Sequence, residues 1–373
     1  MFQRRQIVSV IAATAAALCL VASGIPASAA SADWHRIPNA WGADVKQVQV
    51  GQVYTTGDTT WLAGTVVTNE GLQRPSVQVC SGVSCTLTHL PTLQSEFGGV
   101  ATGVSGTSDT DVWVVGALYG EDGAESMSWH WNGTKWSTVN GSDGEVNMVQ
   151  VLSVSTSESW ALGWNNYEDG STETVYHRVG TVWTEVNSLL DPIFPGTCGE
   201  WYYNTFSDLT YVGGEPVVLG VCDGVPVILK QRSATTWARI DKGLPADVTY
   251  TRATVVKNQL WVAGQRADGS VSIERRASGI WLAVPTTGLT DATIMRMAAG
   301  PRGTVIAVGH TGTSTAPTAA SWRWNGTTWT ALTTPGTAGT SYLPTISIAT
   351  SGYAVTAGTD NSTPASALLL GRG

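Results

Sequence analysis

The stretch Ser321–Leu332 reads SWRWNGTTWTAL, and Ser128–Val139 reads SWHWNGTKWSTV. In both, large and polar side chains alternate on either side of an Asn-Gly pair, which is the period of two expected of β-strands. Asn-Gly is a strong hairpin signal because both residues tolerate the positive φ angles of a type I′ turn. Each stretch therefore predicts a Trp-rich β-hairpin with a type I′ turn, and its recurrence indicates a larger repeat.

A strand that ends in glycine also recurs along the chain. The glycines lie at intervals of 44 to 57 residues and are Gly64, Gly116, Gly163, Gly220, Gly264, Gly309 and Gly358. Such intervals match the length of a four-stranded propeller blade. Each unit reads as a small-residue strand a at a central axis, the glycine strand b, and a hairpin of strands c and d. The sequence therefore predicts an all-β, seven-bladed β-propeller of four-stranded antiparallel blades.

Strand d carries a recurring tryptophan. Large aromatic side chains at a repeated position of an outer strand are suited to fill the space between neighbouring sheets. We expect the following residues to pack between blades rather than to bind a ligand: Trp136, Trp183, Trp237, Trp281 and Trp329.

The two ends of the repeat array complement each other. The seventh unit ends with a strand c, ASALLLGRG, and has no strand d, whereas ADWHRIPN near the start has Trp34 in the place of a strand d. An unpaired sheet edge invites aggregation. We therefore expect the N-terminal strand to pair with Leu368–Leu370 in the last blade and so to close the ring.

Residues 1–30 have the pattern of a signal peptide. Arg4 and Arg5 precede an apolar run that ends with Ala27-Ser28-Ala29, and a basic start, an apolar segment and a small-residue cleavage site define such peptides. We expect residues 31–373 to form one propeller domain that is secreted and extracellular and that does not contact a membrane after cleavage.

The charge of the chain excludes one class of partner. The formal net charge is −8, and removal of residues 1–30 takes away two arginines and no acid, which gives about −10. Because an acidic surface does not bind the negatively charged phosphates, nucleic acid is not an expected partner.

The cysteines are expected to pair in two disulfides. Cys80 and Cys85 occupy the places that Trp131 and Trp136 have in the hairpin of the second unit. Cys198 lies in the longest d-to-a connection, and Cys222 directly follows a strand b. These two types of connection emerge on the same face of a propeller, so of three possible pairings we expect Cys80–Cys85 and Cys198–Cys222. Disulfides fit an oxidising, extracellular setting.

At this point the repeats resemble a family. The glycine in each c-to-d turn, the tryptophan after it and the motifs WNGTKW and WNGTTW are similar to secreted bacterial seven-bladed propellers of the kelch and Asp-box kind, including the central domain of galactose oxidase. The motifs lack the Ser and Asp of an Asp box. The resemblance implies the propeller architecture, which serves hydrolases, lyases, oxidases, lectins and protein scaffolds.

Patterns of catalytic chemistry are weak. A sialidase-like site needs an arginine cluster, and we interpret Arg74, Arg252, Arg266 and Arg296 as scattered surface and inter-blade residues. The five histidines do not have paired-ligand spacing, so we expect no metal centre. His130 and His177 occupy equivalent places in strand c and are interpreted as structural.

Two loops after strand b lie on the face formed by the b-to-c and d-to-a connections. They read ALYGEDGAES and WNNYEDGSTE and bring together Tyr119, Trp164, Tyr167, Glu168 and Asp169. Their oxygens could bind calcium. Asp-Gly recurs at the same place in other units, however, which favours solvated turns and no cofactor.

The long disulfide-braced connection adds Glu200, Trp201 and Tyr202 to that face. Exposed aromatic side chains stack on sugars or anchor peptides, although here they could also plug the mouth of the channel. We expect a ligand site formed by Tyr119, Trp164, Tyr167, Trp201 and Tyr202.

Two functions of different class follow. The favoured one is a secreted, monomeric binding module that recognises an extracellular glycan or protein on this face and has no chemistry of its own. The alternative is a glycoside hydrolase or lyase at the channel mouth, with Glu168 or Asp169 and Glu200 as catalytic carboxylates. Glycoside hydrolysis needs two carboxyl groups roughly 5 to 9.5 Å apart.

Overall fold

The structure is a computed structural model in which Ala32–Gly373 form one compact unit. The structure describes residues 33–38, 40–41, 45–92, 98–120, 123–140, 146–167, 170–193, 204–222, 224–335, 340–360 and 366–373. The predicted signal peptide, residues 1–30, lies outside them and stays a prediction.

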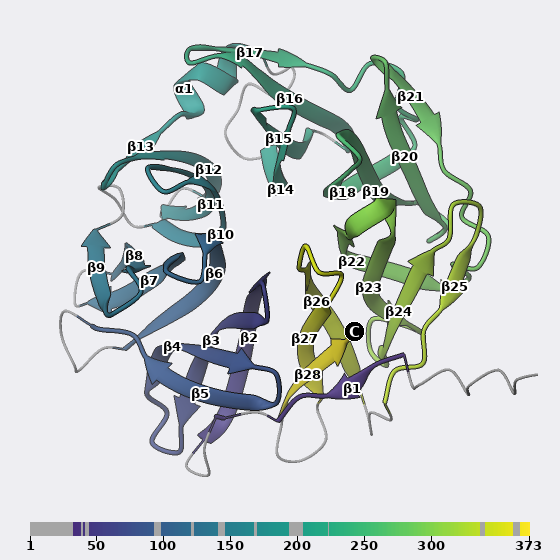
Figure 1. Cartoon of the computed structure of the whole chain (residues 1–373). Helices are drawn as coiled ribbons and strands as arrows, with labels where there is room; N and C mark the ends of the chain where they lie inside the picture. The colour runs from purple at the N-terminus through teal and green to yellow at the C-terminus, as the bar shows by residue number, and fades with distance from the viewer. Residues whose placement is uncertain are drawn as a thin grey trace, which may run out of the picture. The chain divides into compact units, whose positions relative to one another are not determined.

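Seven four-stranded antiparallel sheets form the ring, as the repeat predicts. Figure 1 shows one strand of each sheet at the centre and one at the rim. We name the sheets blades I to VII and their strands a to d from the centre outward. The face formed by the b-to-c and d-to-a connections is called the b–c face, and the opposite one the a–b face.

Blades I to III have the following strands: β2 (Val45–Thr56), β3 (Thr59–Thr68), β4 (Gln73–Ser81) and β5 (Ser84–His89) in blade I; β6 (Gly99–Ser108), β7 (Asp111–Gly120), β8 (Gly123–Trp131) and β9 (Trp136–Asn140) in blade II; β10 (Val146–Ser155), β11 (Glu158–Tyr167), β12 (Gly170–Val179) and β13 (Val182–Glu185) in blade III. A short helix, α1 (Asn187–Leu190), and the 3₁₀ turn η1 (Asp191–Ile193) follow β13.

Blades IV to VII have the following strands: β14 (Asn204–Val212), β15 (Glu215–Cys222), β16 (Val225–Ser233) and β17 (Thr236–Arg239) in blade IV; β18 (Val248–Val256), β19 (Gln259–Arg266), β20 (Val271–Ala277) and β21 (Ile280–Ala283) in blade V; β22 (Ala292–Ala299), β23 (Val305–Thr311), β24 (Thr318–Trp324) and β25 (Trp329–Ala331) in blade VI; β26 (Ser341–Ile348), β27 (Ala354–Asp360), β28 (Ser366–Arg372) and β1 (His35–Arg36) in blade VII. The 3₁₀ turn η3 (Pro301–Gly303) joins β22 to β23.

The N-terminal strand closes the ring, as predicted. In blade VII, β1 is paired with β28, and Arg36 lies opposite Leu370. The Trp34 side chain is 1% exposed and its indole N–H donates a 2.8 Å hydrogen bond to Ser321 Oγ in blade VI. Asp33 accepts a 2.6 Å bond from the Arg372 guanidinium. The chain start is therefore fixed to blades VI and VII.

The core lies between blades. The apolar clusters of the described residues each combine residues of two adjacent blades, including one between blades VII and I. The strand-d tryptophans pack there, as predicted. Trp136 is edge-on to Trp61 of blade I, and Trp237 is edge-on to Trp160 of blade III. Stability therefore depends on contacts between blades, because one sheet alone has two apolar faces.

The recurring glycine of strand b has a steric cause. Gly116 lies opposite Ala101, the last residue before a β-bulge in strand a, and a Cβ on Gly116 would lie 1.9 Å from the Val100 carbonyl oxygen. Gly264 repeats this in blade V, 2.2 Å from the Thr249 carbonyl oxygen. Only glycine permits this approach. The bulge shifts the register of strand a and so redirects the residue that follows it.

The Asn-Gly hairpins form, but their turn differs from the predicted type I′. Trp131 pairs with Trp136 across a four-residue loop. Gly133 has a φ of +89°, whereas Asn132 is not among the residues with positive φ. The Asn132 Oδ1 atom instead accepts hydrogen bonds from the backbone N–H groups of Thr134 and Lys135. The asparagine therefore caps the loop through its side chain, which is a second reason for its turn preference.

Candidate functional site

The predicted ligand residues of the b–c face are described in part. Tyr119 is half-buried near the end of β7, and Trp164 on β11 is 48% exposed. The backbone of Tyr167 continues β11. Trp164 is thus an aromatic side chain that is available to a ligand on this face.

The remaining predicted site residues lie outside the described residues. They are the carboxylates Glu168, Asp169 and Glu200, the aromatics Trp201 and Tyr202, and Cys198. The pair of catalytic carboxyl groups therefore stays a prediction. The Cys80–Cys85 disulfide is present as predicted. Cys222 is also disulfide-bonded, and its pairing with Cys198 stays a prediction.

Glu173 lies directly across the strand pair from Trp164, on β12. Both side chains project on the side of blade III that faces blade IV, because Trp160 and Leu162, at alternate positions of β11, pack with residues of β14–β17. Sequence reasoning missed Glu173. Glu173 could have been found only from its pairing with Trp164, and that pairing requires knowledge of the hairpin register.

The Glu173 carboxyl has an unusual acidity. Burial raises its pKa to about 7, although hydrogen bonds from its own N–H and from the Phe206 N–H act in the opposite direction. The backbone around it is held firmly. Asn187, at the start of α1, donates from Nδ2 to the Glu173 carbonyl and accepts from the Val175 N–H. A carboxyl that exchanges its proton near neutral pH therefore lies beside an exposed indole.

A second polar cluster surrounds Asp208 in the ring centre. Asp208 follows the β-bulge of β14 and is 1% exposed. Its Oδ1 atom accepts bonds from Gln150 Nε2 (2.9 Å) in blade III and from Arg296 (2.9 Å) in blade VI. Its Oδ2 atom accepts a 2.8 Å bond from the Ala253 N–H in blade V. One carboxylate therefore contacts three other blades.

Arg252 adds a second guanidinium to this cluster. It follows the bulge of β18, as Arg296 follows that of β22. Its pKa is lowered by burial and by Arg296, whereas Asp208 acts in the opposite direction. The interpretation of Arg252 and Arg296 as inter-blade residues is confirmed, but the two residues are not scattered. The bulges bring both to one place, which the spacing in the sequence does not show. Because Asp208 is saturated with donors, we assign the cluster a structural role.

His130 and His177 form equivalent arrangements on the a–b face. His130 stacks on Trp113 with ring centroids 4.3 Å apart, and its Nε2 lies 2.8 Å from Asp111. His177 repeats this arrangement with Trp160 and Glu158 in blade III. Each histidine thus has an aromatic and a carboxylate partner.

The described part of the chain holds no group of three or more His, Cys, Asp or Glu side chains arranged for a metal ion. Within the same residues, no helix has the length and apolar character needed to cross a membrane.

Comparison with known proteins extends only to the fold. No protein-family model and no curated protein sequence matches the chain. Among solved structures, the chain is similar to YCF48 bound to D1 peptide, with 12% identity, a TM-score of 0.56, and coverage of 91% of this chain and 96% of that one. This similarity supports the β-propeller fold and nothing further.

Two further structures support the same statement. The β-propeller domain of the Trilobed protease from Pyrococcus furiosus has 8% identity and a TM-score of 0.57, with 88% of this chain and 94% of that chain covered. A puromycin-hydrolyzing peptidase of Mycobacterium tuberculosis has 12% identity and a TM-score of 0.58 over 91% of this chain. The present chain spans about half of that peptidase, 54%.

Proposed function

We propose that the chain is an extracellular binding module whose ligand, a carbohydrate, is recognised on the b–c face. The exposed indole of Trp164 carries this proposal. An indole offers a flat apolar surface on which a sugar ring stacks, and Glu173 opposite it supplies a polar group for the hydroxyls. The predicted signal peptide and the disulfides support an extracellular location.

A protein ligand on this face is the other form of the same function. The likeness to a propeller with a bound peptide supports it. In that case Trp164 would act as a rigid aromatic anchor, the residue type that dominates binding energy in many interfaces. The experiment below separates the two ligand classes.

A glycoside hydrolase or lyase is the second candidate, and the acidity of Glu173 favours it. A carboxyl with a pKa of about 7 suits a general acid at neutral pH. The mechanism needs a second carboxyl group roughly 5 to 9.5 Å away. Glu168, Asp169 and Glu200 are the residues proposed for that role.

A glycan array and a peptide display library, both probed with the wild type and with Trp164→Ala, test the proposal. We expect a glycan signal that falls about tenfold or more in the variant, because one stacked aromatic contributes on the order of 1–3 kcal/mol. Ile280→Ala serves as the control, since Ile280 is an exposed apolar residue on the opposite face. Unchanged binding by Trp164→Ala would remove this face from consideration.

Glu173→Gln separates binding from catalysis. A binding module keeps its glycan affinity within a few fold, because glutamine still offers hydrogen bonds. A hydrolase loses turnover of a fluorogenic glycoside by about 10²-fold or more while it retains binding.

A further inference from the structure

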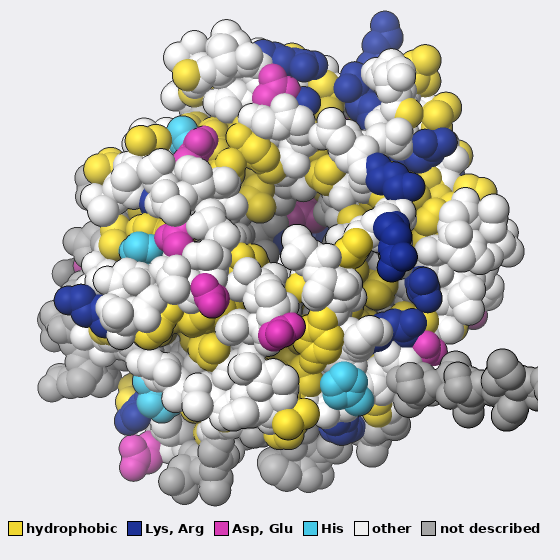
Figure 2. All heavy atoms as spheres, in the orientation of Figure 1, with side chains coloured by type: hydrophobic (Ala, Val, Ile, Leu, Met, Phe, Trp, Pro, Cys, Tyr) yellow, Lys and Arg dark blue, Asp and Glu magenta, His cyan; other side chains and the backbone are white. Residues whose placement is uncertain are grey.

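Charges of opposite sign occupy different parts of the a–b face. Figure 2 shows Lys and Arg side chains gathered on the side where Figure 1 places β16, β20 and β24. Most acids of this face lie in the a-to-b connections of blades I to III, or at their ends, and are Asp58, Asp109, Asp111 and Glu158; blade IV adds Glu215. The cations that blades IV to VI place on this face, here called the basic band, are Lys230, Arg232, Lys257, Arg275, Arg276, Arg302 and Arg323.

One position of the repeat explains why Arg275 of the basic band has no carboxylate partner. The first residue of strand b is an acid in blades II to IV, and a histidine or lysine of strand c lies beside it. In blade II the pair is Asp111 with His130, and in blade IV Glu215 with Lys230 at 2.7 Å. In blade V the same two places hold Gln259 and Arg275, which share a 3.0 Å hydrogen bond. Blade V thus has the cation without the carboxylate.

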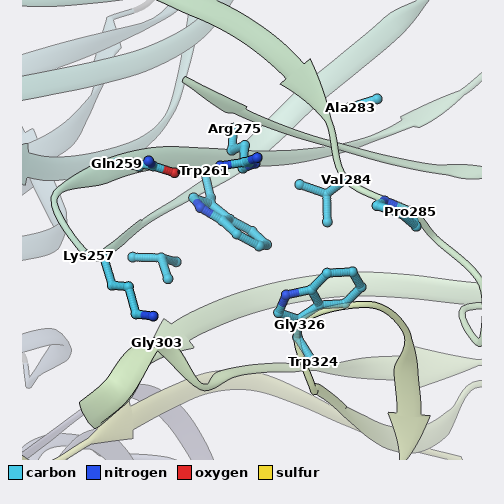
Figure 3. Close-up of a pocket in the computed structure, with 11 residues that line it drawn as sticks. Lys257, Gln259, Trp261, Arg275, Ala283, Val284, Pro285, Gly303, Trp324 and Gly326 are labelled. Atoms are coloured by element: carbon cyan, nitrogen blue, oxygen red, sulfur yellow. Dashed lines mark hydrogen bonds between the residues drawn. The ribbon is translucent and has the colours of Figure 1, made fainter. Parts of the chain in front are cut away.

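A pocket between blades V and VI opens beside this cation. It has a volume of about 390 Å³ and is lined by Lys257, Arg275, Trp261 and Trp324 among others. Figure 3 shows the Lys257 side chain and the two indoles around one hollow. The indole centroids are 6.2 Å apart and edge-on. Within the described residues, no carboxylate lies within ion-pair distance of Lys257 or Arg275.

A second pocket lies one blade away, between blades IV and V. It has a volume of about 190 Å³ and is lined by Lys230, Arg276 and Asn258 among others. Lys230 is already paired with Glu215. The pKa of Arg276 is lowered by burial and by the like charge of Arg232. Arg276 and Arg232 of the basic band therefore repel each other, and an anion beside them would relieve this repulsion.

We propose that the basic band docks an acidic, extended protein segment, which places one carboxylate at Lys257 and Arg275 and a second at Arg276. This site lies on the face opposite the proposed carbohydrate site and does not depend on it. The pocket between blades V and VI also has apolar walls, Val256, Val284 and Pro285. Such walls suit the apolar part of a side chain, whereas a sulfated polysaccharide would need the charges alone.

Two of the acids on the same face of a second copy fit the basic band less well. Asp111 and Glu158 are each hydrogen-bonded to a histidine of their own blade. Docking them into the basic band would remove those bonds. A segment whose carboxylates have no partner before binding does not lose such bonds.

Fluorescence anisotropy of a fluorescein-labelled decaglutamate peptide tests the proposal at about 50 mM salt, where the charges are screened little. The decisive variant is Gln259→Glu. It restores in blade V the carboxylate that blades II to IV contain, and it should weaken peptide binding about tenfold by occupying Arg275. Lys257→Glu should weaken binding at least as much. Thermal unfolding of each variant verifies that it is folded.

The matched control is Lys135→Gln, which changes the net charge by the same amount as Gln259→Glu and lies on the same face in blade II. We expect its affinity to stay within twofold of the wild type. Equal weakening by both variants would show attraction by net charge and overturn the site. Absence of decaglutamate binding overturns the proposal as well. In that case, binding of dextran sulfate would indicate a polysaccharide ligand, and a dimer that Lys257→Glu abolishes would indicate a second copy of the chain.

Discussion

Glu173 combines burial with a place beside an exposed aromatic residue. Its carboxyl lies opposite Trp164, and its pKa of about 7 is set mainly by desolvation. An acid whose pKa is raised on folding holds a proton that the unfolded chain releases. The contribution of Glu173 to stability is therefore greatest below its ordinary pKa of 4.5 and falls as the pH rises to about 7.

Glu173→Gln should reduce this pH dependence. Relative to the wild type, the variant gains about 1–2 kcal/mol of unfolding free energy between pH 5 and pH 8, after allowance for partial solvent exposure. Urea unfolding at both pH values measures the difference. Glu125→Gln, an exposed acid on β8, provides the control. The same difference in the control variant would contradict this explanation.

Residue identities that repeat could be predicted from the sequence, whereas single departures from the repeat could not. The strand-d tryptophans have a fixed place, so their packing between blades followed from the pattern. Glu173, Asp208 and Gln259 matter because of what lies across the strand or across the ring. Those neighbours depend on the register of the strands and on the bulges in strand a, and neither can be inferred from the amino-acid composition.

At the level of elements, the hairpin of β4 and β5 replaces a tryptophan pair by a disulfide. Cys80 and Cys85 lie opposite each other with Cα atoms 4.1 Å apart, in the places where blade II has Trp131 and Trp136. The spacing of five residues and the alignment of the hairpins predicted this pairing. The turn type was not predicted, because Asn132 uses its side chain and not its backbone conformation.

The double variant Cys80→Ser, Cys85→Ser should lower the unfolding free energy by about 2 kcal/mol, the loop-closure entropy expected for so short a loop. Denaturant unfolding under non-reducing conditions measures it. The other described disulfide cysteine, Cys222, is left intact in this variant. A loss of more than about 5 kcal/mol of unfolding free energy would indicate that the disulfide does more than close this loop.

Across the whole molecule, contacts over the ring centre supplement those between adjacent blades. Asp208 of blade IV accepts bonds from blades III, V and VI. The number of blades and the closing strand could be predicted because they depend on counting repeats. The polar contacts in the channel could not, since one carboxylate joins four blades there and its partner Arg296 lies two repeats away.

Asp208→Asn should destabilise the protein by about 3–5 kcal/mol, because it leaves Arg296 and Arg252 without their buried carboxylate. Urea unfolding measures the change. Asp58→Asn, in the exposed turn between β2 and β3, removes the same charge and should alter stability by less than about 0.5 kcal/mol. Equal effects of the two variants would contradict the role assigned to the channel cluster.

The pairing of β1 with β28 has a consequence for biosynthesis. Asp33 and Arg372, which join these strands, are 339 residues apart in the chain. At the usual rate of translation, the first strand leaves the ribosome on the order of tens of seconds before its partner is made. During that interval blade VII, which packs against blade I in the closed ring, has not yet been made. A prematurely terminated chain therefore cannot close the ring and leaves apolar surface exposed. Chaperones and proteases can recognise this surface, which the complete folded chain buries.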